Sequence, residues 1–165
     1  MPPSSPMLPP ELERLDVAIL LLENRQPVSR WAMVTWSVTG IVCRTAPPGR
    51  TLVREAGPIR EYMFGGLRLR LHRDECESYY HNLVSPRPQM YVIARPDEVD
   101  GAPEPFHVSA SFDEANAYAE TDEDVYQVDI PPEAYAWSER FVLSHYVPEP
   151  RRKRKRRDWK QEGLR

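Results

Sequence analysis

Alternating hydrophobic and polar positions along the chain predict a succession of short β-strands. The alternation is clearest in Trp31–Val42, where Val34, Trp36 and Val38 share one face and threonines and a serine share the other. Period-two alternation with β-branched and aromatic residues is typical of a half-buried strand. Similar alternation, and short apolar runs between turn residues, predict the remaining strands. These are Leu15–Leu22, Thr51–Arg54, Arg60–Phe64, Leu67–Leu71, Gln89–Arg95, Phe106–Ala110 and Val125–Ile130.

Three further segments carry helix signals. The first follows Asp74, which forms with Glu77 an acidic variant of the capping box. The second follows a capping box made of Ser111 and Glu114. The third opens on two prolines, which are tolerated in the first turn of a helix. The predicted helices cover residues 74–84, 113–120 and 131–146.

This irregular order of elements predicts an α+β fold. About seven strands and three helices do not alternate as in a parallel βαβ arrangement, so we expect a mostly antiparallel, strongly bent sheet covered by the helices. Gly65-Gly66 is expected to break the chain between two strands. We expect Trp36, Trp137 and Phe141 in the core, because each lies on an apolar stripe of a strand or helix.

Composition divides the 165 residues into three parts. Residues 1–11 are rich in Pro and Ser and predict a disordered lead-in, residues 12–148 a single domain, and residues 149–165 a basic tail. Residues 151–165 hold nine Lys or Arg and two Asp or Glu, a charge of +7, whereas the other 150 residues sum to −10. This uneven charge distribution gives information about binding partners and not about the fold.

The residues that usually mark a metal or cofactor site are sparse. Cys43 and Cys76 form no CxxC pair and predict two small buried side chains in a reducing compartment. Glu77 and His81 share one helix face, but we interpret them as a solvated face because no second ligand pair has a useful spacing. There is no phosphate-binding glycine loop. We therefore expect no metal and no cofactor.

Catalytic and membrane signals are equally weak. The four histidines (His72, His81, His107 and His145) lie in no recognised nucleophile motif, and we expect structural roles for them and no catalytic residue. The longest apolar run, Val17–Leu22, is too short to span a bilayer, and no secretory signal is visible. We expect a cytoplasmic protein without a membrane span.

The basic tail is the strongest anomaly in the sequence. Its seven consecutive basic residues repel one another and do not pack in a core. Together with the nearby tryptophan, they are suited to binding RNA, anionic lipid or an acidic protein surface. A solvated tail that aids solubility is the alternative. The expected partner-binding residues are Arg151, Arg152, Lys153, Arg154, Lys155, Arg156, Arg157 and Trp159.

An acidic stretch near the second predicted helix offers the tail an internal partner. Docking of the tail there would hide both charges and weaken the RNA-binding interpretation. The acidic residues are Asp113, Glu114, Glu120, Asp122, Glu123 and Asp124.

Several short segments carry a resemblance that covers most of residues 14–159. They are Ser29-Arg30-Trp31 with Trp36; Leu69-Arg70-Leu71 leading to Asp74-Glu75, Tyr79 and Asn82-Leu83; Ser85, Pro88, Tyr91-Val92 and Arg95; Pro131-Pro132-Glu133 with Trp137; and Phe141, His145-Tyr146-Val147-Pro148-Glu149 and Lys153-Arg154-Lys155-Arg156. Together these segments resemble a bacterial family known as domain of unknown function number 3305.

The resemblance implies a context for the protein and no mechanism. Genes of this family tend to lie beside those for formate dehydrogenase, its iron–sulfur partners and its maturation factors. Some members carry names from molybdopterin–guanine dinucleotide biosynthesis, but that nucleotidyltransferase needs a Gly-rich N-terminal loop and residues 1–30 contain no Gly.

Three functions follow as hypotheses. The first is a non-enzymatic accessory or assembly protein that acts with a molybdenum-dependent formate dehydrogenase or its maturation factors. The second is an RNA-binding module that uses the basic tail and Trp159. The third is an enzyme with an unrecognised site, in which Arg68, Arg70, His72 and Glu75 line one edge of a cleft.

Overall fold

The computed structural model describes residues 14–28 and 30–148. The predicted lead-in, residues 1–11, and the predicted tail, residues 149–165, lie outside this range. Within the described residues the chain forms seven strands, three α-helices and a 3-10 turn, so the α+β class is confirmed. The strands are β1 Arg14–Val28, β2 Trp31–Val42, β3 Gly49–Ala56, β4 Ile59–Arg70, β5 Gln89–Pro96, β6 Pro103–Ser109 and β7 Asp124–Asp129. The helices are α1 Cys76–Leu83, α2 Phe112–Ala119 and α3 Pro132–His145, and the 3-10 turn is Arg73–Glu75.

The strands form two antiparallel sheets, not the one strongly bent sheet that the sequence predicts. Sheet A has the order β2-β1-β4-β3 and sheet B the order β6-β5-β7. Neither sheet needs to curl strongly, because the chain leaves sheet A after β4 and enters sheet B only after the 3-10 turn and α1. The single bent sheet is therefore corrected to two stacked sheets.

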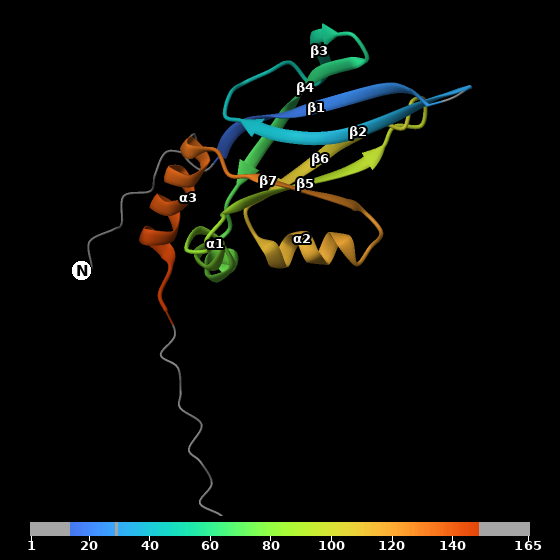
Figure 1. The fold of residues 1–165 in the computed structure, drawn as a ribbon. Coiled ribbons are helices and arrows are strands. Elements are labelled where there is room, and N and C mark those ends of the chain that lie inside the picture. Colours follow the sequence, from blue (N-terminus) through green and yellow to red (C-terminus); the bar gives the residue numbers. More distant parts are fainter. Residues whose placement is uncertain (1–13, 29, 149–165) are drawn as a thin grey trace, which may run out of the picture.

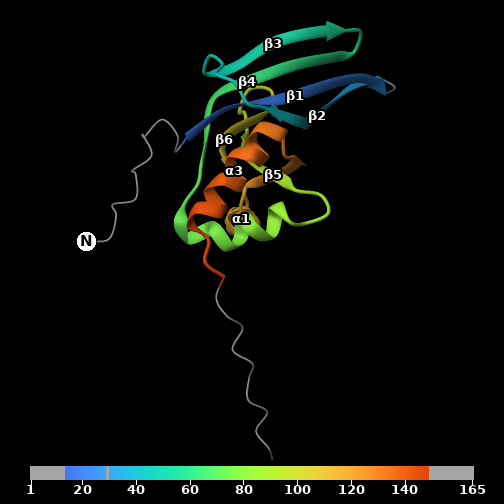
Figure 2. The ribbon, with the colours of Figure 1, turned by 90° about the vertical axis from the view of Figure 1, so that its left-hand side faces the viewer.

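The molecule is layered, with the main core between the two sheets. Sheet A lies over one face of sheet B, α2 covers the opposite face of sheet B, and α1 and α3 close one end (Figures 1 and 2). The main core cluster combines inward residues of both sheets with residues of α1 and α3, and Tyr91, Ile93 and Ala115 form a second cluster under α2. The main cluster contains Val17, Ile19, Leu21, Ile41, Leu69, Leu71, Tyr79, Leu83, Met90, Val92, Val108, Ala110, Val128, Ala134, Trp137 and Val142.

Strand β4 runs unbroken through Gly65-Gly66, where the sequence predicts a break. A Cβ on Gly65 would lie 2.4 Å from the Pro47 carbonyl oxygen, so glycine is required for the β2–β3 connection to cross the strand. Gly66 has a φ of 87°, which favours glycine. The two glycines therefore allow a close backbone approach within one continuous strand.

The helix signals were partly right. The Ser111 side chain caps α2 by accepting a 3.1 Å hydrogen bond from the Glu114 amide, so the predicted cap is confirmed. The cap predicted at Asp74 is wrong, because Asp74 lies in the 3-10 turn and α1 begins at Cys76 without a side-chain cap. Trp137 is buried as predicted, whereas Trp36 and Phe141 are only partly buried.

Candidate functional site

An arginine stacked on two aromatic rings marks the first candidate site. The guanidinium carbon of Arg50 lies 5.2 Å from the Trp36 ring centre and 5.0 Å from the Tyr62 ring centre. The two rings are themselves 5.6 Å apart. Because Trp36 comes from β2, Tyr62 from β4 and Arg50 from β3, the group spans all of sheet A on its inner face.

Two exposed apolar side chains extend this group. Val34 lies two residues before Trp36 on β2, and Leu52 of β3 lies directly opposite Tyr62 of β4. Both side chains therefore lie on the same face of sheet A as the two aromatic rings. They are 41% and 48% exposed. We call Val34, Trp36, Arg50, Leu52 and Tyr62 the aromatic platform.

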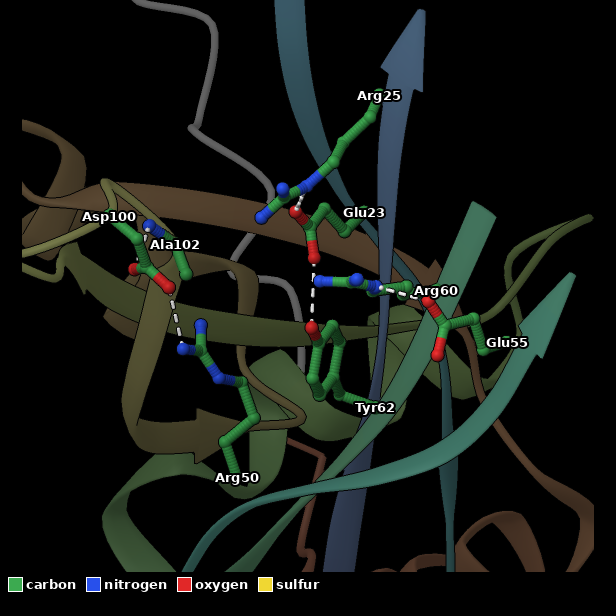
Figure 3. Close-up of polar contacts among 8 residues, drawn as sticks. All are labelled: Glu23, Arg25, Arg50, Glu55, Arg60, Tyr62, Asp100 and Ala102. Atoms are coloured by element: carbon green, nitrogen blue, oxygen red, sulfur yellow. Dashed lines mark hydrogen bonds and ion pairs between the residues drawn. The ribbon is translucent and has the colours of Figure 1, made fainter. Parts of the chain in front are cut away.

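A buried carboxylate lies beneath the platform. The Glu23 side chain on β1 is 2% exposed, and it accepts hydrogen bonds from Arg25 and, at 2.8 Å, from the Tyr62 hydroxyl. Figure 3 shows the Arg60 guanidinium beside both groups, while its Nε donates to Glu55 at 2.9 Å. Burial opposes ionisation of Glu23, but the hydrogen bonds and the positive charges outweigh it and hold its pKa below the ordinary value.

A salt bridge ties the platform to sheet B. Arg50 donates a 2.6 Å hydrogen bond to Asp100, which lies in the loop between β5 and β6 (Figure 3). The Ala102 amide donates to the other Asp100 oxygen at 3.0 Å and so orients the carboxylate. The bond from Arg50 lowers the pKa of Asp100. Arg50 is therefore held on both sides, by two rings and by a fixed carboxylate.

A second candidate site is a cavity of about 460 Å³ between β4 and β6. Arg68 and Arg70 are alternate residues at the end of β4, so their side chains project to the same side. His72 follows two residues after the strand ends and lines the same cavity. His107 of β6 lies on the other wall. We call this cavity the basic pocket; its lining residues are Gly66, Leu67, Arg68, Arg70, His72, Phe106 and His107.

An acidic side chain fixes one of the histidines. His107 Nε2 lies 2.6 Å from one carboxylate oxygen of Glu114, and the Ser109 hydroxyl donates to the other oxygen at 2.6 Å. The bond with His107 is the main reason that the pKa of Glu114 is lowered. Glu114 comes from the first turn of α2, so the helix behind sheet B orients a side chain in the pocket.

The structure brings three of the four cleft residues of the enzyme hypothesis together. Arg68, Arg70 and His72 all line the basic pocket, but Glu75 does not. The Glu75 carboxylate instead accepts a 2.7 Å hydrogen bond from the Ser111 hydroxyl, at the start of α2. The opposite wall of the pocket is formed in part by His107, which is hydrogen-bonded to Glu114.

The other predicted ligand-type residues have ordinary partners. On the exposed face of α1, a Glu77 carboxylate oxygen lies 3.7 Å from His81 Nε2. Residues 14–28 and 30–148 contain no cluster of three metal-ligating side chains. Both cysteines are free thiols, and burial raises their pKa values. Within the acidic stretch, Glu123 forms a salt bridge with Arg95. The predicted partner-binding residues of the tail lie outside the described range.

Sequence reasoning missed Glu23, Arg50 and the His107–Glu114 pair. Glu23 stands in phase with Val17, Ile19 and Leu21, so the period-two pattern continued by one step would have turned it inward. The partners of Arg50 come from two other strands and a loop. Glu114 is only seven residues from His107, but the bond joins a strand to the following helix, and neither the period-two pattern nor the helical pattern predicts it.

The sequence matches one known protein family. A family described as proteins of unknown function, DUF3305, matches residues 16–155. The chain belongs to DUF3305. The DUF3305 match includes the aromatic platform, the basic pocket and residues 151–155 of the basic tail. No curated protein and no solved structure matches the chain.

Among the residues that the structure describes, no helix is both long and apolar enough to cross a bilayer.

Proposed function

We propose that this member of DUF3305 is a non-enzymatic accessory or assembly protein that binds a protein partner through the aromatic platform. The observation that carries the proposal is the stacking of Arg50 on Trp36 and Tyr62 beside two exposed apolar side chains. Arg, Trp and Tyr are the residue types that contribute most binding energy at protein interfaces.

The rigidity of the platform supports this function. Arg50 is fixed by Asp100, and Tyr62 is fixed by the buried Glu23 carboxylate. Side chains that are already ordered lose little conformational entropy on binding, so more of their contact energy remains as affinity. A platform held from beneath by a buried ionic network is thus suited to act as an anchor for a partner.

Family membership guides the choice of partner. The gene neighbourhood implied by the family makes formate dehydrogenase, or one of its maturation factors, the first candidate. The basic tail, with Arg151–Arg157 and Trp159, would steer the encounter with an acidic surface of that partner. In this proposal the aromatic platform provides the binding affinity, and the basic tail raises the rate of association.

Affinity purification from the native host under formate-oxidising conditions tests the proposal. Tagged wild-type protein should retain formate dehydrogenase or a maturation factor. The variant Val34→Asp should lose it, because an unpaired carboxylate would be buried within the contact. Met33→Asp is the matched control, since Met33 is 58% exposed and, as the neighbouring residue of β2, points to the opposite face of sheet A.

Two results would contradict this function. If Val34→Asp and Met33→Asp retain the same partners as the wild type, the platform does not form the interface. If only RNA is recovered, and increasing salt releases it steeply, the tail acts as an RNA-binding segment instead. Equal thermal stability of the two variants would show that any difference arises at the surface.

A further inference from the structure

The basic pocket lies where the edges of the two sheets meet. Beyond Gly66, β4 pairs only with β1, because β3 pairs with the first half of β4 as far as Gly65. The other edge of this half of β4 approaches β6, the outer strand of sheet B, without a strand ladder between them. The cavity is the space between these two strands, with basic residues on the β4 side.

The arginines that line the pocket outnumber the carboxylates that pair with them. Arg68 is paired with Asp16 at 3.1 Å, and His107 is paired with Glu114. Within residues 14–28 and 30–148, Arg70 forms no salt bridge and the His72 ring forms no hydrogen bond. Among these residues, the Arg70 side chain and the His72 ring therefore have no hydrogen-bond acceptor, although His72 interacts electrostatically with Glu114.

A like-charge pair adds a second, independent observation. Arg70 lies directly opposite Arg14 in the β1–β4 ladder, and Arg14 also lacks an acidic partner among the described residues. Like charges directly opposite each other destabilise an antiparallel pair. An anion at the mouth of the pocket would remove this repulsion.

We propose that the basic pocket binds the phosphate group of a small phosphorylated molecule, with Arg70 and His72 as its direct ligands. A planar guanidinium binds two oxygens of one phosphate at once, and a phosphate monoester carries close to two negative charges. His107, held by Glu114, contacts the ligand from the opposite wall. The site is separate from the aromatic platform and does not depend on the function proposed for it.

The size of the cavity favours a phosphorylated molecule over a bare ion. A volume of about 460 Å³ falls within the range of small-molecule sites, roughly 300–1,000 Å³. A phosphate beside Arg70 would leave space next to Leu67 and Phe106 for the rest of the molecule.

Titration of the full chain with inorganic phosphate at constant ionic strength tests the site. Calorimetry should show saturable binding, and the ring resonances of His72 and His107 should shift with the same dissociation constant. Arg70→Gln and His72→Gln should each weaken binding at least about tenfold, which corresponds to about 1.4 kcal/mol. Arg87→Gln is the matched control, because it removes the same charge from an arginine paired with Asp129 on β7, outside the pocket.

Two further ligands identify the source of the phosphate. Glycerol phosphate should bind more tightly than inorganic phosphate if the pocket accepts a soluble monoester. Vesicles containing phosphatidic acid would bind instead if the headgroup comes from a lipid. Arg70→Lys keeps the charge but loses the planar fork, so it should weaken binding less than Arg70→Gln and serves if the glutamine variant fails to fold.

Other results would overturn the site. Non-saturable phosphate binding, or equal affinity in Arg70→Gln and Arg87→Gln, would show only general attraction to positive charge. Phosphate binding that disappears when residues 151–165 are removed, with Arg70 intact, would assign the anion to the tail. Neither result would affect the aromatic platform, which the Val34 and Met33 variants test separately.

Discussion

The Tyr62 hydroxyl donates a 2.8 Å hydrogen bond to the carboxylate of Glu23, whose side chain is 2% exposed. Tyr62 lies on β4 and Glu23 on the adjacent strand β1. A buried carboxylate without partners would favour its protonated form, but here Arg25 and Tyr62 hold it ionised. The stability of sheet A is therefore linked to one ionisation.

Acid should weaken the fold through Glu23. Its pKa is lower in the folded state than in the unfolded chain, so its contribution is complete above the unfolded value, about 4.3, and is lost as the pH falls through the folded value. Urea melts between pH 7 and pH 3 should show this loss in the wild type. Glu23→Gln should show a smaller loss over the same window, and equal pH dependence of the two proteins would contradict the linkage.

Removal of the Tyr62 hydroxyl should also destabilise the protein. Tyr62→Phe leaves a buried carboxylate with one donor fewer, and hydrogen bonds to charged groups contribute about 1.5–3 kcal/mol. Denaturant melts at neutral pH measure the change in the free energy of unfolding. The matched control is Tyr80→Phe on α1, where the ring is 38% exposed and its hydroxyl has no hydrogen bond among the described residues; its change should stay within about 0.5 kcal/mol.

Truncation of Trp137 should be among the most costly substitutions in α3. Trp137 is 9% exposed and belongs to the main core cluster, so Trp137→Ala should cost about 3–5 kcal/mol. Phe141→Ala should fall at the lower end of that range, because Phe141 is only partly buried. Leu143 on the same helix is 77% exposed, and Leu143→Ala should change the free energy of unfolding by no more than about 0.5 kcal/mol. A loss below about 1 kcal/mol for Trp137→Ala would contradict its place in the core.

Two glycines in sheet A should respond differently to alanine. At Gly65 the added Cβ would meet backbone and side-chain atoms of Pro47 and Ala46 at 2.4 to 2.7 Å, so Gly65→Ala should cost about 1–3 kcal/mol or more. At Gly40 the nearest atom is the flexible end of Leu20 at 3.7 Å, and Gly40→Ala should be close to neutral. Thermal melts of the pair provide the test, and similar melting temperatures would contradict the close approach of the β2–β3 connection to β4.

Deletion of residues 151–165 should leave the melting temperature nearly unchanged and slow partner binding. The segment has no apolar periodicity, and adjacent positive charges do not favour burial. Association with a captured partner should lose part of its salt dependence, because the charge that steers the encounter is gone. A melting temperature many degrees lower would show a packed tail, and unchanged association would show a tail without a role in docking.

The elements were more predictable than their arrangement. Period-two alternation in Trp31–Val42 and the Ser111–Glu114 cap are local signals, and both elements form where they predict. The break expected at Gly65-Gly66 did not occur, because the reason for glycine lies in the distant Pro47 carbonyl. The division into two sheets depends on pairings between strands far apart in sequence, which no local window contains.

The candidate sites were predictable only in part. Arg68, Arg70 and His72 could be grouped because they are close in sequence, but His107 lines the same cavity from a strand of the other sheet. Arg50 could not be placed, since its two aromatic contacts and its acidic partner come from β2, β4 and the β5–β6 loop. Each of these contacts is tertiary.

The main core joins Val17 and Ile19 of the first strand to Trp137 and Val142 of the last helix. No segment much shorter than residues 14–148 contains both halves of this packing. During translation, the core that contains the apolar face of β1 therefore stays incomplete until α3 has left the ribosome. A chain stalled within α3 would expose hydrophobic strand surface, which aggregates readily and is a typical target of chaperones.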